Sequence, residues 1–357
     1  MENVKVAIWG FGAMGSGIAE VLLRKQGVDI VGVCDNHESR VGLNICDLLN
    51  VSSESCPTVT VKEDIREVVT RRSADICILA TDSFVKKAFG KLVYLLEQGV
   101  NVITTAEEMC FPQEKYPEES AELDRIAKEN GVTVLGTGIN PGLVMDLLAI
   151  CLSGAMTDVE SVLCRRVNSL SPFGPAVMEE QGVGLAPEEF EKRARNGTLA
   201  GHVGFAESAG MLNRALGLGM DEFRQHMSPI IAETDRKSPY GEAKTGTVAG
   251  IDMRGQGFAG GRPVISMEHP QQIEPEAEGT QTGDIIVLEG NPRIRMEIKP
   301  EIDGGIGTIA MCVNCIPLVI NARPGLVTML DLPVPRAVMG DYRNYIEEHK
   351  RRFLSKK

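Results

Sequence analysis

The 357-residue sequence predicts an α/β protein, with a doubly wound parallel sheet first and a second, mixed α+β domain after it. Over the first 140 residues, short β-branched runs alternate with longer amphipathic stretches, which is typical of repeated βαβ units. Beyond that point longer β-like runs appear, broken by glycine-rich turns. A chain of this length is also too long for one ordinary core. We therefore expect two domains.

Six short runs should form the strands of the first sheet. Amphipathic stretches between them, of which 83–99 and 121–131 are the clearest, should form the helices. In the first of these stretches apolar residues recur along one stripe, and Gly99 is expected to end the helix. The expected strands lie at residues 4–10, 29–35, 58–61, 74–81, 100–105 and 132–138.

Composition excludes several classes of function. The formal net charge of -12 argues against a nucleic-acid partner, because phosphate binding needs clustered Lys and Arg. The one dense basic run, 349–357, reads as a solvated tail. We find no uncharged apolar run of about 18 residues and no signal segment, so we expect no membrane contact. Nine scattered cysteines suggest reduced thiols and a soluble cytoplasmic protein.

The turn after the first expected strand carries the pattern G-x-G-x-x-G. Gly10 would make the turn tight, Gly12 would let backbone approach a pyrophosphate, and Gly15 would let helix and strand pack closely. A purely structural glycine turn is the alternative, but the strand before it and the helix after it favour a dinucleotide site. The backbone N–H groups expected to face the phosphates are those of Phe11, Ala13 and Met14.

The end of the second expected strand bears on the choice of cofactor. Asp35 follows Gly15 by 20 residues and would accept hydrogen bonds from the adenosine ribose, which favours NAD. Arg40 is close enough in sequence to leave NADP open. Ligands of such sheets bind beyond the carboxyl ends of the strands, which adds Thr81 and Thr105 as candidate cofactor contacts. The motif and its context thus predict a Rossmann-type domain that binds NAD or NADP.

Two carboxylates, Glu107 and Glu108, directly follow the fifth expected strand. One reading is that both are solvated loop acids or that one caps the next helix, and the other is that one is the acid/base of the reaction. Many two-domain reductases carry a lysine in this loop, whereas the first lysine here is Lys115. An acid at this position suits a cationic substrate, because it could take a proton from an ammonium, stabilise an iminium and activate water. We expect one of the two to face the substrate.

Further substrate contacts are expected after the sixth strand and in the second domain. Asn140 lies in a sharp turn and could face the cleft. The alternative is that this segment is only a turn that leads into a helix. The candidates of the second domain are also open to an ordinary role in the fold. These candidates are Arg165, Arg166, Asn168, His202, Glu207, Glu268 and His269.

Other kinds of chemistry have little support. None of the five histidines stands at metal-ligand spacing from a cysteine or an acid, so we expect no metal. The pair Cys312 and Cys315 lies in an apolar stretch and reads mainly as core packing. A serine nucleophile elbow and a phosphate-loop lysine are both missing. Of the kinds of chemistry considered, hydride transfer is the one that the sequence still supports.

The sequence resembles 2,4-diaminopentanoate dehydrogenase and the related native amine dehydrogenases from the first strand to about Pro335. Its N-terminal domain is also similar to that of dihydrodipicolinate reductase. The motifs that carry the resemblance are "IWGFGAMGSGIA", "TTAEEM", "GTGINPGLVMD", "GHVGFAES" and "AMCVNCIPLVINARPGLVTMLDLPVP".

The resemblance implies NAD(P)-dependent oxidative deamination of 2,4-diaminopentanoate at carbon 4, a step of ornithine fermentation that releases 2-amino-4-oxopentanoate and ammonia. It implies a homodimer and a key glutamate within the Glu107/Glu108 pair. Another small ketone or diamino acid as substrate, and a non-catalytic NAD(P) sensor, remain alternatives. The expected domains are an NAD(P)-binding domain at 1–142, a substrate and dimerisation domain at 143–306, and a helical segment at 307–357 that packs back near the first domain.

Overall fold

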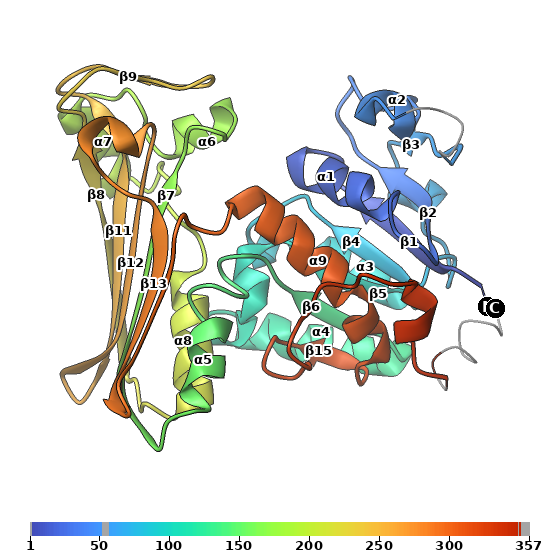
Figure 1. The fold of residues 1–357 in the computed structure, drawn as a ribbon. Coiled ribbons are helices and arrows are strands. Elements are labelled where there is room, and N and C mark those ends of the chain that lie inside the picture. The colour runs from blue at the N-terminus through green and yellow to red at the C-terminus, as the bar shows by residue number, and fades with distance from the viewer. Residues whose placement is uncertain (1, 52–56, 349, 351–357) are drawn as a thin grey trace. The chain divides into compact units, whose positions relative to one another are not determined.

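The computed structural model describes residues 2–51, 57–348 and 350. The chain forms two compact units: unit 1 comprises Met1–Gly142 and Gly304–Lys357, and unit 2 comprises Leu143–Asp303. Each unit has its own sheet and its own helices (Figure 1). The solvated tail expected at 349–357 lies outside the described residues, apart from Lys350.

Unit 1 contains a seven-stranded sheet in the order β15-β6-β5-β4-β1-β2-β3, and every neighbouring pair is parallel. The predicted doubly wound parallel sheet is therefore confirmed. The expected run 58–61 overlaps its strand only at Val61. The strands are β1 Val4–Trp9, β2 Val28–Cys34, β3 Val61–Lys62, β4 Ile76–Leu79, β5 Asn101–Thr104, β6 Thr133–Gly136 and β15 Gly325–Val327.

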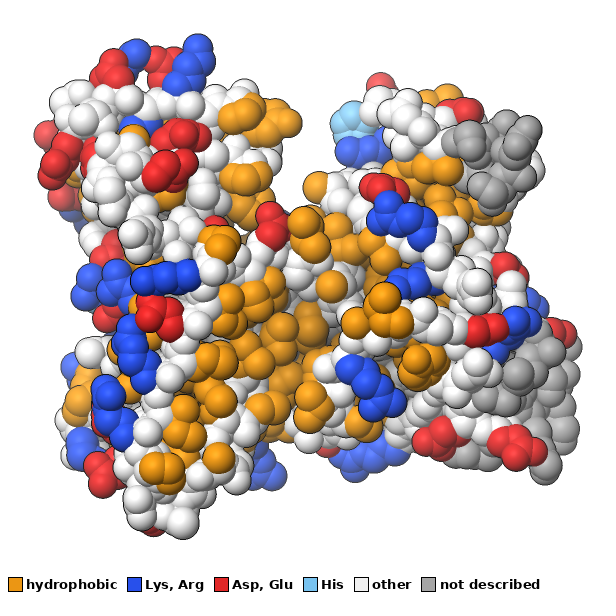
Figure 2. Space-filling view, in the orientation of Figure 1, with side chains coloured by type: hydrophobic (Ala, Val, Ile, Leu, Met, Phe, Trp, Pro, Cys, Tyr) orange, Lys and Arg blue, Asp and Glu red, His pale blue; other side chains and the backbone are white. Residues whose placement is uncertain are grey.

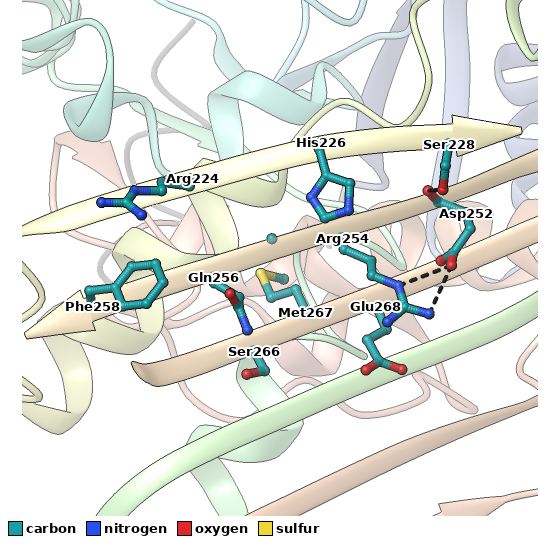
Figure 3. A pocket seen from close by; sticks show the side chains of 11 residues that line it. Arg224, His226, Ser228, Asp252, Arg254, Gln256, Phe258, Ser266, Met267 and Glu268 are labelled. Carbon is teal, nitrogen blue, oxygen red and sulfur yellow. Dashed lines mark hydrogen bonds and ion pairs between the residues drawn. The ribbon is translucent and has the colours of Figure 1, made fainter. Parts of the chain in front are cut away.

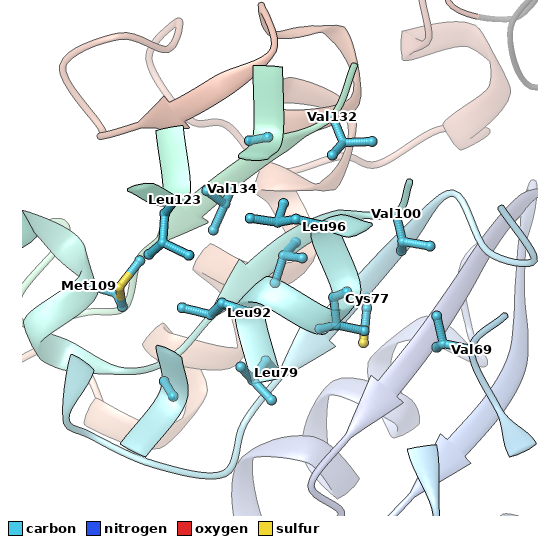
Figure 4. Packing of buried hydrophobic residues seen from close by; sticks show 14 of the residues in the cluster. Val69, Cys77, Leu79, Leu92, Leu96, Val100, Met109, Leu123, Val132 and Val134 are labelled. Carbon is cyan, nitrogen blue, oxygen red and sulfur yellow. The ribbon is translucent and has the colours of Figure 1, made fainter. Parts of the chain in front are cut away.

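Helices cover both faces of this sheet (Figure 1). Helices α3 (Val85–Glu97) and α4 (Pro117–Asn130) contribute Leu92, Leu96 and Leu123 to a buried cluster with strand residues such as Val134 (Figure 4). The other described helical segments of residues 2–142 are α1 Ala13–Leu22, α2 Ile45–Leu49, η2 Ile65–Glu67, η3 Glu107–Cys110 and η4 Pro112–Glu114.

The C-terminal segment of unit 1 adds helix α9 (Gly304–Asn321), strand β15 and the short helix η6 (Tyr342–Tyr345). Helix α9 contacts α1, β5 and β6, and it corrects the expectation that no uncharged run reaches 18 residues. By length and composition α9 could cross a membrane, but half of it is buried within the protein. Its contacts are those of a core helix. The β15 strand was not foreseen.

Unit 2 contains a six-stranded mixed sheet in the order β14-β13-β7-β12-β11-β8. Only the β12–β7 pair is parallel, and the other pairs are antiparallel. The mixed second domain is therefore confirmed. The strands are β7 Asp158–Ser169, β8 Glu222–Ile231, β11 Val248–Ala259, β12 Arg262–Gln272, β13 Gly283–Asn291 and β14 Ile294–Ile298, with a separate hairpin of β9 Arg236–Lys237 and β10 Glu242–Ala243.

Helices α5 (Leu147–Ser153) and α8 (Phe205–Leu216) lie on the same side of this sheet in Figure 1. A Cβ added to Gly255 on β11 would lie 2.9 Å from the ring of Phe205, so helix and strand meet closely there. We call this side the inner face and the opposite side the outer face. The remaining helices are α6 Pro175–Glu180, α7 Pro187–Arg195 and η5 Pro275–Glu278.

The cysteines follow the expected reduced state with one correction. Cys46, at the start of α2, is disulfide-bonded. Burial raises the pKa of the Cys34 and Cys315 thiols to about 12, which keeps both protonated and unreactive. The free cysteines among the described residues are Cys34, Cys77, Cys110, Cys151, Cys164, Cys312 and Cys315.

Candidate active site

Two of the three glycines in the turn after β1 are required by contacts within the protein. Gly10 has a φ of +96°, and a Cβ there would lie 2.4 Å from the carbonyl oxygen of Ala80. A Cβ on Gly15 would lie 1.8 Å from the carbonyl oxygen of Gly10. No side chain fits at either position, so these glycines bring β1, α1 and the end of β4 together.

Gly12 differs, because a Cβ there would meet no protein atom within 4 Å. Packing does not explain this glycine. Gly12 is the N-cap residue of α1, and no side chain caps that helix. The first N–H groups of α1, including those of Ala13 and Met14, belong to the helix end that favours anions. An open space beside an uncapped helix start fits the pyrophosphate of a dinucleotide.

The backbone N–H of Phe11 corrects one expectation. It donates to the Asp35 carboxylate at 2.5 Å, and the Phe11 side chain is buried. This N–H group therefore has its hydrogen-bond partner within the protein and does not face a phosphate. Asp35 also accepts from the backbone N–H of His37 at 2.8 Å. Asp35 thus ties the glycine turn to the loop after β2.

Arg40 lies against the same carboxylate. Its guanidinium is 3.2 Å from Asp35 Oδ2 and 3.3 Å from Oδ1, and its side chain is 32% exposed. The Asp35 carboxylate is only 7% exposed. A partly exposed cation beside a buried acid at this position can pair with a 2′-phosphate if it turns outward.

The ends of β4 and β5 lie next to the glycine turn. A Cβ on Gly10 would lie 2.9 Å from Thr81 Cγ2, and the N–H of Thr105 donates to Leu79. Thr81 Oγ1 accepts a 2.8 Å hydrogen bond from Lys91 Nζ. Two of the predicted cofactor contacts, Thr81 and Thr105, are therefore on the edge of the sheet that carries the glycine turn.

Both carboxylate oxygens of Glu108 accept hydrogen bonds from residues of unit 1. Its Oε2 accepts from the backbone N–H of Val85 at 2.9 Å, and its Oε1 accepts from the Tyr116 hydroxyl at 3.2 Å. Lys115 Nζ lies 3.8 Å from Oε1, and the residue is 5% exposed. Lys115, the first lysine after β5, therefore pairs with the second glutamate.

Glu107 belongs to the same turn of η3 but is half-buried. The 137–142 loop lies beside η3, because a Cβ on Gly136 would be 2.2 Å from Met109 and Cys110 Sγ donates to the carbonyl of Pro141. Asn140, in that loop, is 8% exposed. The structure therefore brings the glutamate pair and the Asn140 loop together at one edge of the sheet.

In unit 2 the adjacent arginines point to opposite faces of the sheet, because successive side chains of a strand alternate. Arg165 lies on the outer face and pairs with Glu268 at 2.8 Å. Arg166 lies on the inner face, where it is 2% exposed and 2.6 Å from Asp284. The two arginines therefore lie on opposite faces of the sheet, and Glu268 lies on the face of Arg165. Their contact with substrate stays a prediction.

Arg166 is held by two partners that neutralise and orient it. Its Nη2 donates to the carbonyl of Ile302, in addition to the Asp284 ion pair. Asp284 also accepts from the Ile302 N–H at 2.9 Å. Burial raises the pKa of Asp284, whereas the guanidinium beside it acts in the opposite direction.

A polar group lies on the inner face with Arg166. His269 Nε2 and Asn168 Oδ1 are 2.8 Å apart, and the rings of His202 and His269 are 4.6 Å apart. Burial and the Arg166 charge lower the pKa of His202 to about 3, and burial and neighbouring charge also lower the pKa of His269. Both imidazoles are neutral near pH 7. His269 Nδ1 is buried and has no hydrogen-bond partner among the described residues.

Sequence reasoning missed Asp284, Lys91 and Asp146. Asp284 opposes Arg166 directly in the β13–β7 register, and Lys91 pairs with Asp82 at 2.5 Å. Asp146 is fully buried and accepts from the Ser208 hydroxyl of α8. Strand register and helix packing fix these pairs. Glu207, a weaker candidate, is also fully buried on α8. The described residues hold no cluster of metal-ligating side chains.

The fold and these loops define a two-domain dehydrogenase that uses a nicotinamide dinucleotide. Residues 6–135 match the model of the saccharopine dehydrogenase NADP binding domain, and residues 143–348 match that of the 2,4-diaminopentanoate dehydrogenase C-terminal domain. The cofactor is therefore NAD or NADP. The chain belongs to the 2,4-diaminopentanoate dehydrogenase family, which confirms the resemblance seen in the motifs.

Relatives agree over nearly the whole chain. The 2,4-diaminopentanoate dehydrogenase of Acetoanaerobium sticklandii is 56% identical over 349 residues, covering 98% of both chains. The structure of an amine dehydrogenase from Mycobacterium smegmatis superposes with a TM-score of 0.84 at 29% identity, over 95% of this chain and 98% of that one. A dihydrodipicolinate reductase from Paenisporosarcina sp. TG-14, at 13% identity and a TM-score of 0.50 over 92% and 98% of the chains, shares the fold alone.

Proposed function

We propose that this enzyme oxidises the carbon-4 amine of 2,4-diaminopentanoate with NAD+ or NADP+, releasing 2-amino-4-oxopentanoate and ammonia. Membership of the family supports the substrate, and the named relative in Acetoanaerobium sticklandii carries that activity in its name. The acidic loop after β5 supports chemistry on an amine, because it offers a carboxylate near the sheet edge that carries the glycine turn.

The cofactor would be held by the open space at Gly12, the N-terminus of α1 and the Asp35–Arg40 pair. When bound, its nicotinamide supplies a hydride acceptor. Thr81 and Thr105, at the ends of β4 and β5, support the ribose and nicotinamide end.

Glu107 is the acid/base in this proposal. We assign the role to Glu107 rather than to Glu108 because one carboxylate oxygen of Glu108 accepts from the Val85 N–H and the other from the Tyr116 hydroxyl. Glu107 takes a proton from the substrate ammonium, which leaves a neutral amine able to lose hydride from its carbon. Once that proton has passed to solvent, the negative charge of the carboxylate stabilises the iminium, and the carboxylate takes a proton from the water that attacks it. Return of that proton to the nitrogen of the resulting carbinolamine expels ammonia, and loss of the hydroxyl proton leaves the ketone.

The polar group of unit 2 binds the amino-acid end of the substrate. Asn168 and the two neutral histidines can accept or donate hydrogen bonds, and Arg166 adds a buried positive charge that Asp284 offsets. The unpartnered Nδ1 of His269 supports this role, because buried polar atoms are nearly always hydrogen-bonded. Asn140, in the loop that lies beside η3, is a further candidate for a polar contact with substrate.

The observation that carries the proposal is that both carboxylate oxygens of Glu108 are hydrogen-bonded within unit 1, which leaves Glu107 as the proposed acid/base. It is tested by following NADH and NADPH formation at 340 nm with 2,4-diaminopentanoate, alanine and ornithine as separate substrates. Turnover with the diamino acid, with one ammonia released per reduced cofactor, supports the proposal. Turnover only with a simpler amine would keep the glutamate chemistry and overturn the substrate.

The remaining proposals concern the oligomeric state, the pathway and the cellular location of the enzyme. We propose a homodimer and a place in ornithine degradation on the strength of the family. A cytoplasmic location is supported by the seven free cysteines, although the disulfide at Cys46 stands against it.

A further inference from the structure

Three buried polar atoms in one region of unit 2 have no hydrogen-bond partner among the described residues. They are Oε1 of Gln181, Nε2 of Gln271 and Nδ1 of His269. The three residues are only 5%, 7% and 3% exposed. Buried polar atoms are nearly always hydrogen-bonded, because an unpaired one has lost its bonds to water without replacing them. Such a set indicates a bound group that supplies the missing partners.

Gln271 and His269 lie on the inner face of the unit 2 sheet. They are two positions apart on β12, so their side chains point to the same side. In the strand register His269 is opposite Met253, and Gln271 is opposite Asn168. His269 Nε2 and Asn168 Oδ1 are 2.8 Å apart. Gln271 therefore lies beside the polar group that we propose for the amino-acid end of the substrate.

The alternate side chains of β11 and β12 point to the outer face instead. Figure 3 shows Arg254 and Glu268 on that face, among the residues that line a hollow of about 570 Å³. Arg254 pairs with Asp252 there. Basic and acidic side chains lie together over the strands of unit 2 in Figure 2. The unpaired amide of Gln271 therefore belongs to the inner face and not to this charged surface.

Gln181 reaches the same region from the end of α6. Its Nε2 donates to the carbonyl of Gly201 at 2.8 Å. A carbonyl only accepts, so this bond fixes the orientation of the amide and leaves Oε1 as the unpaired acceptor. A Cβ on Gly201 would lie 3.5 Å from Met253 Sδ, which also accepts from the N–H of His202. The rings of His202 and His269 are 4.6 Å apart, so Gln181 joins the same group.

The unpaired atoms match the chemistry of an α-amino acid. The carbon-2 end of 2,4-diaminopentanoate carries an ammonium, which needs acceptors, and a carboxylate, which needs donors. Gln181 offers an unpaired acceptor and Gln271 an unpaired donor. Arg166, the buried cation of this face, only donates and so cannot serve the ammonium.

We propose that Gln181 and Gln271 are specificity-determining residues that select an α-amino acid as substrate. Gln181 Oε1 accepts from the carbon-2 ammonium, and Gln271 Nε2 donates to the carboxylate. This inference rests on the proposed function and names the residues that recognise the end of the substrate that does not react. An analogue that lacks either group is rejected, because it leaves a buried polar atom of the enzyme unpaired.

Three substrates that differ by one group at a time test the assignment in the full chain with saturating cofactor. They are 2,4-diaminopentanoate, 4-aminopentanoate, which lacks the carbon-2 amine, and pentan-2-amine, which lacks the carboxylate as well. Gln181→Met should lower the ratio of kcat/KM for the first substrate over the second by about 10-fold or more. Gln271→Met should lower the ratio for the second substrate over the third by about 10-fold or more.

Gln281→Met is the matched control, because Gln281 is an exposed residue of the same unit, and it should keep both wild-type ratios. A general folding defect affects all three substrates alike and cancels in each ratio. Urea unfolding of Gln271→Met adds a second readout. Loss of an unpaired polar group should leave its midpoint unchanged or raise it, whereas loss of a structural water site would lower the midpoint and keep the ratio.

The same ratios are also measured as dissociation constants, by calorimetric titration of each amine into the complex with NADH or NADPH. This measurement needs no turnover. A wild type that binds the diamino acid with the expected preference but does not oxidise it would contradict only the proposed reaction. A folded Gln181→Met or Gln271→Met variant with its wild-type ratio in both measurements would overturn the role of that glutamine.

Discussion

The carboxylate of Glu108 accepts a 2.9 Å hydrogen bond from the backbone N–H of Val85, the first residue of α3. A helix leaves its first four N–H groups without partners inside the helix, so this bond stabilises the start of α3. Glu108 therefore has a structural role at the start of α3.

Replacing Glu107 should lower activity, whereas replacing Glu108 should lower stability. Glu107→Gln should lower kcat by about 10² to 10⁴ with little change in cofactor affinity, since it removes a proton acceptor. Glu108→Gln should lower the free energy of unfolding by about 1 kcal/mol, because it weakens the charge-assisted bond to Val85. Steady-state kinetics and urea unfolding of both variants check this. The reverse pattern would assign the chemistry to Glu108.

Gly12→Val should abolish cofactor binding without destabilising the protein. A Cβ at Gly12 meets no protein atom within 4 Å, so the added side chain can clash only with a bound pyrophosphate. Gly90→Val is the matched control, because Gly90 is equally open but lies in α3. NADH titration by fluorescence should show a loss of at least 100-fold for the first variant alone. Equal affinity in both variants would contradict the placement of the pyrophosphate.

Arg40→Ala should change the choice of cofactor. Removing the guanidinium leaves the Asp35 carboxylate to repel a 2′-phosphate, so NADPH should bind at least 10-fold more weakly. NADH should bind as well as before or better. Titration of the apoenzyme with NADPH, NADH and 2′-AMP measures this directly. An equal loss for all three would show that Arg40 only holds Asp35 in place.

Arg166→Met should be severely destabilising. It leaves Asp284 buried without its positive partner, and breaking a buried pair in this way costs about 3–5 kcal/mol. Arg293→Met is the matched control, because the Arg293–Glu289 pair is on the surface and contributes about 1 kcal/mol or less. Denaturant unfolding at one protein concentration compares the two. Similar losses would mean that the Arg166–Asp284 pair is not buried in solution.

Stability should fall as the pH drops from about 6.5 toward 3. The folded protein keeps His202 neutral down to a pKa of about 3, whereas the unfolded chain binds a proton below about 6.5. The unfolded state therefore gains protons that the folded state does not. His202→Asn should make the slope shallower between pH 6 and 4.5, by up to about 1.4 kcal/mol per pH unit. Parallel curves for wild type and variant would contradict a neutral buried His202.

The sequence predicted the fold and the cofactor turn well because both depend on local patterns. The alternation of strands and helices is visible along the chain, and the close contact that requires Gly15 is with Gly10, five residues earlier. The Phe11 N–H was assigned wrongly because its acceptor, Asp35, is 24 residues away in the chain. The 20-residue spacing from Gly15 placed Asp35 near the turn. It did not show that the Asp35 carboxylate accepts hydrogen bonds from the N–H groups of Phe11 and His37.

The second unit was harder to predict because strand register decides which side chains meet. The run "RRVNS" contains two arginines of equal appearance, and only the pairing of β7 with β12 and β13 separates Arg165 from Arg166. Strand β15 was missed because three residues after a helix carry little pattern. The Asn168–His269 contact joins residues 101 positions apart, and no local signal connects them.

The most direct test of the account is a comparison of wild type with Glu107→Gln in a single assay of reduced cofactor and ammonia. With 2,4-diaminopentanoate, wild type should release one ammonia for each NADH or NADPH formed, and Glu107→Gln should lose nearly all turnover while binding NADH normally. Full turnover in the Glu107→Gln variant would contradict the central claim that this carboxylate is the acid/base of an amine oxidation.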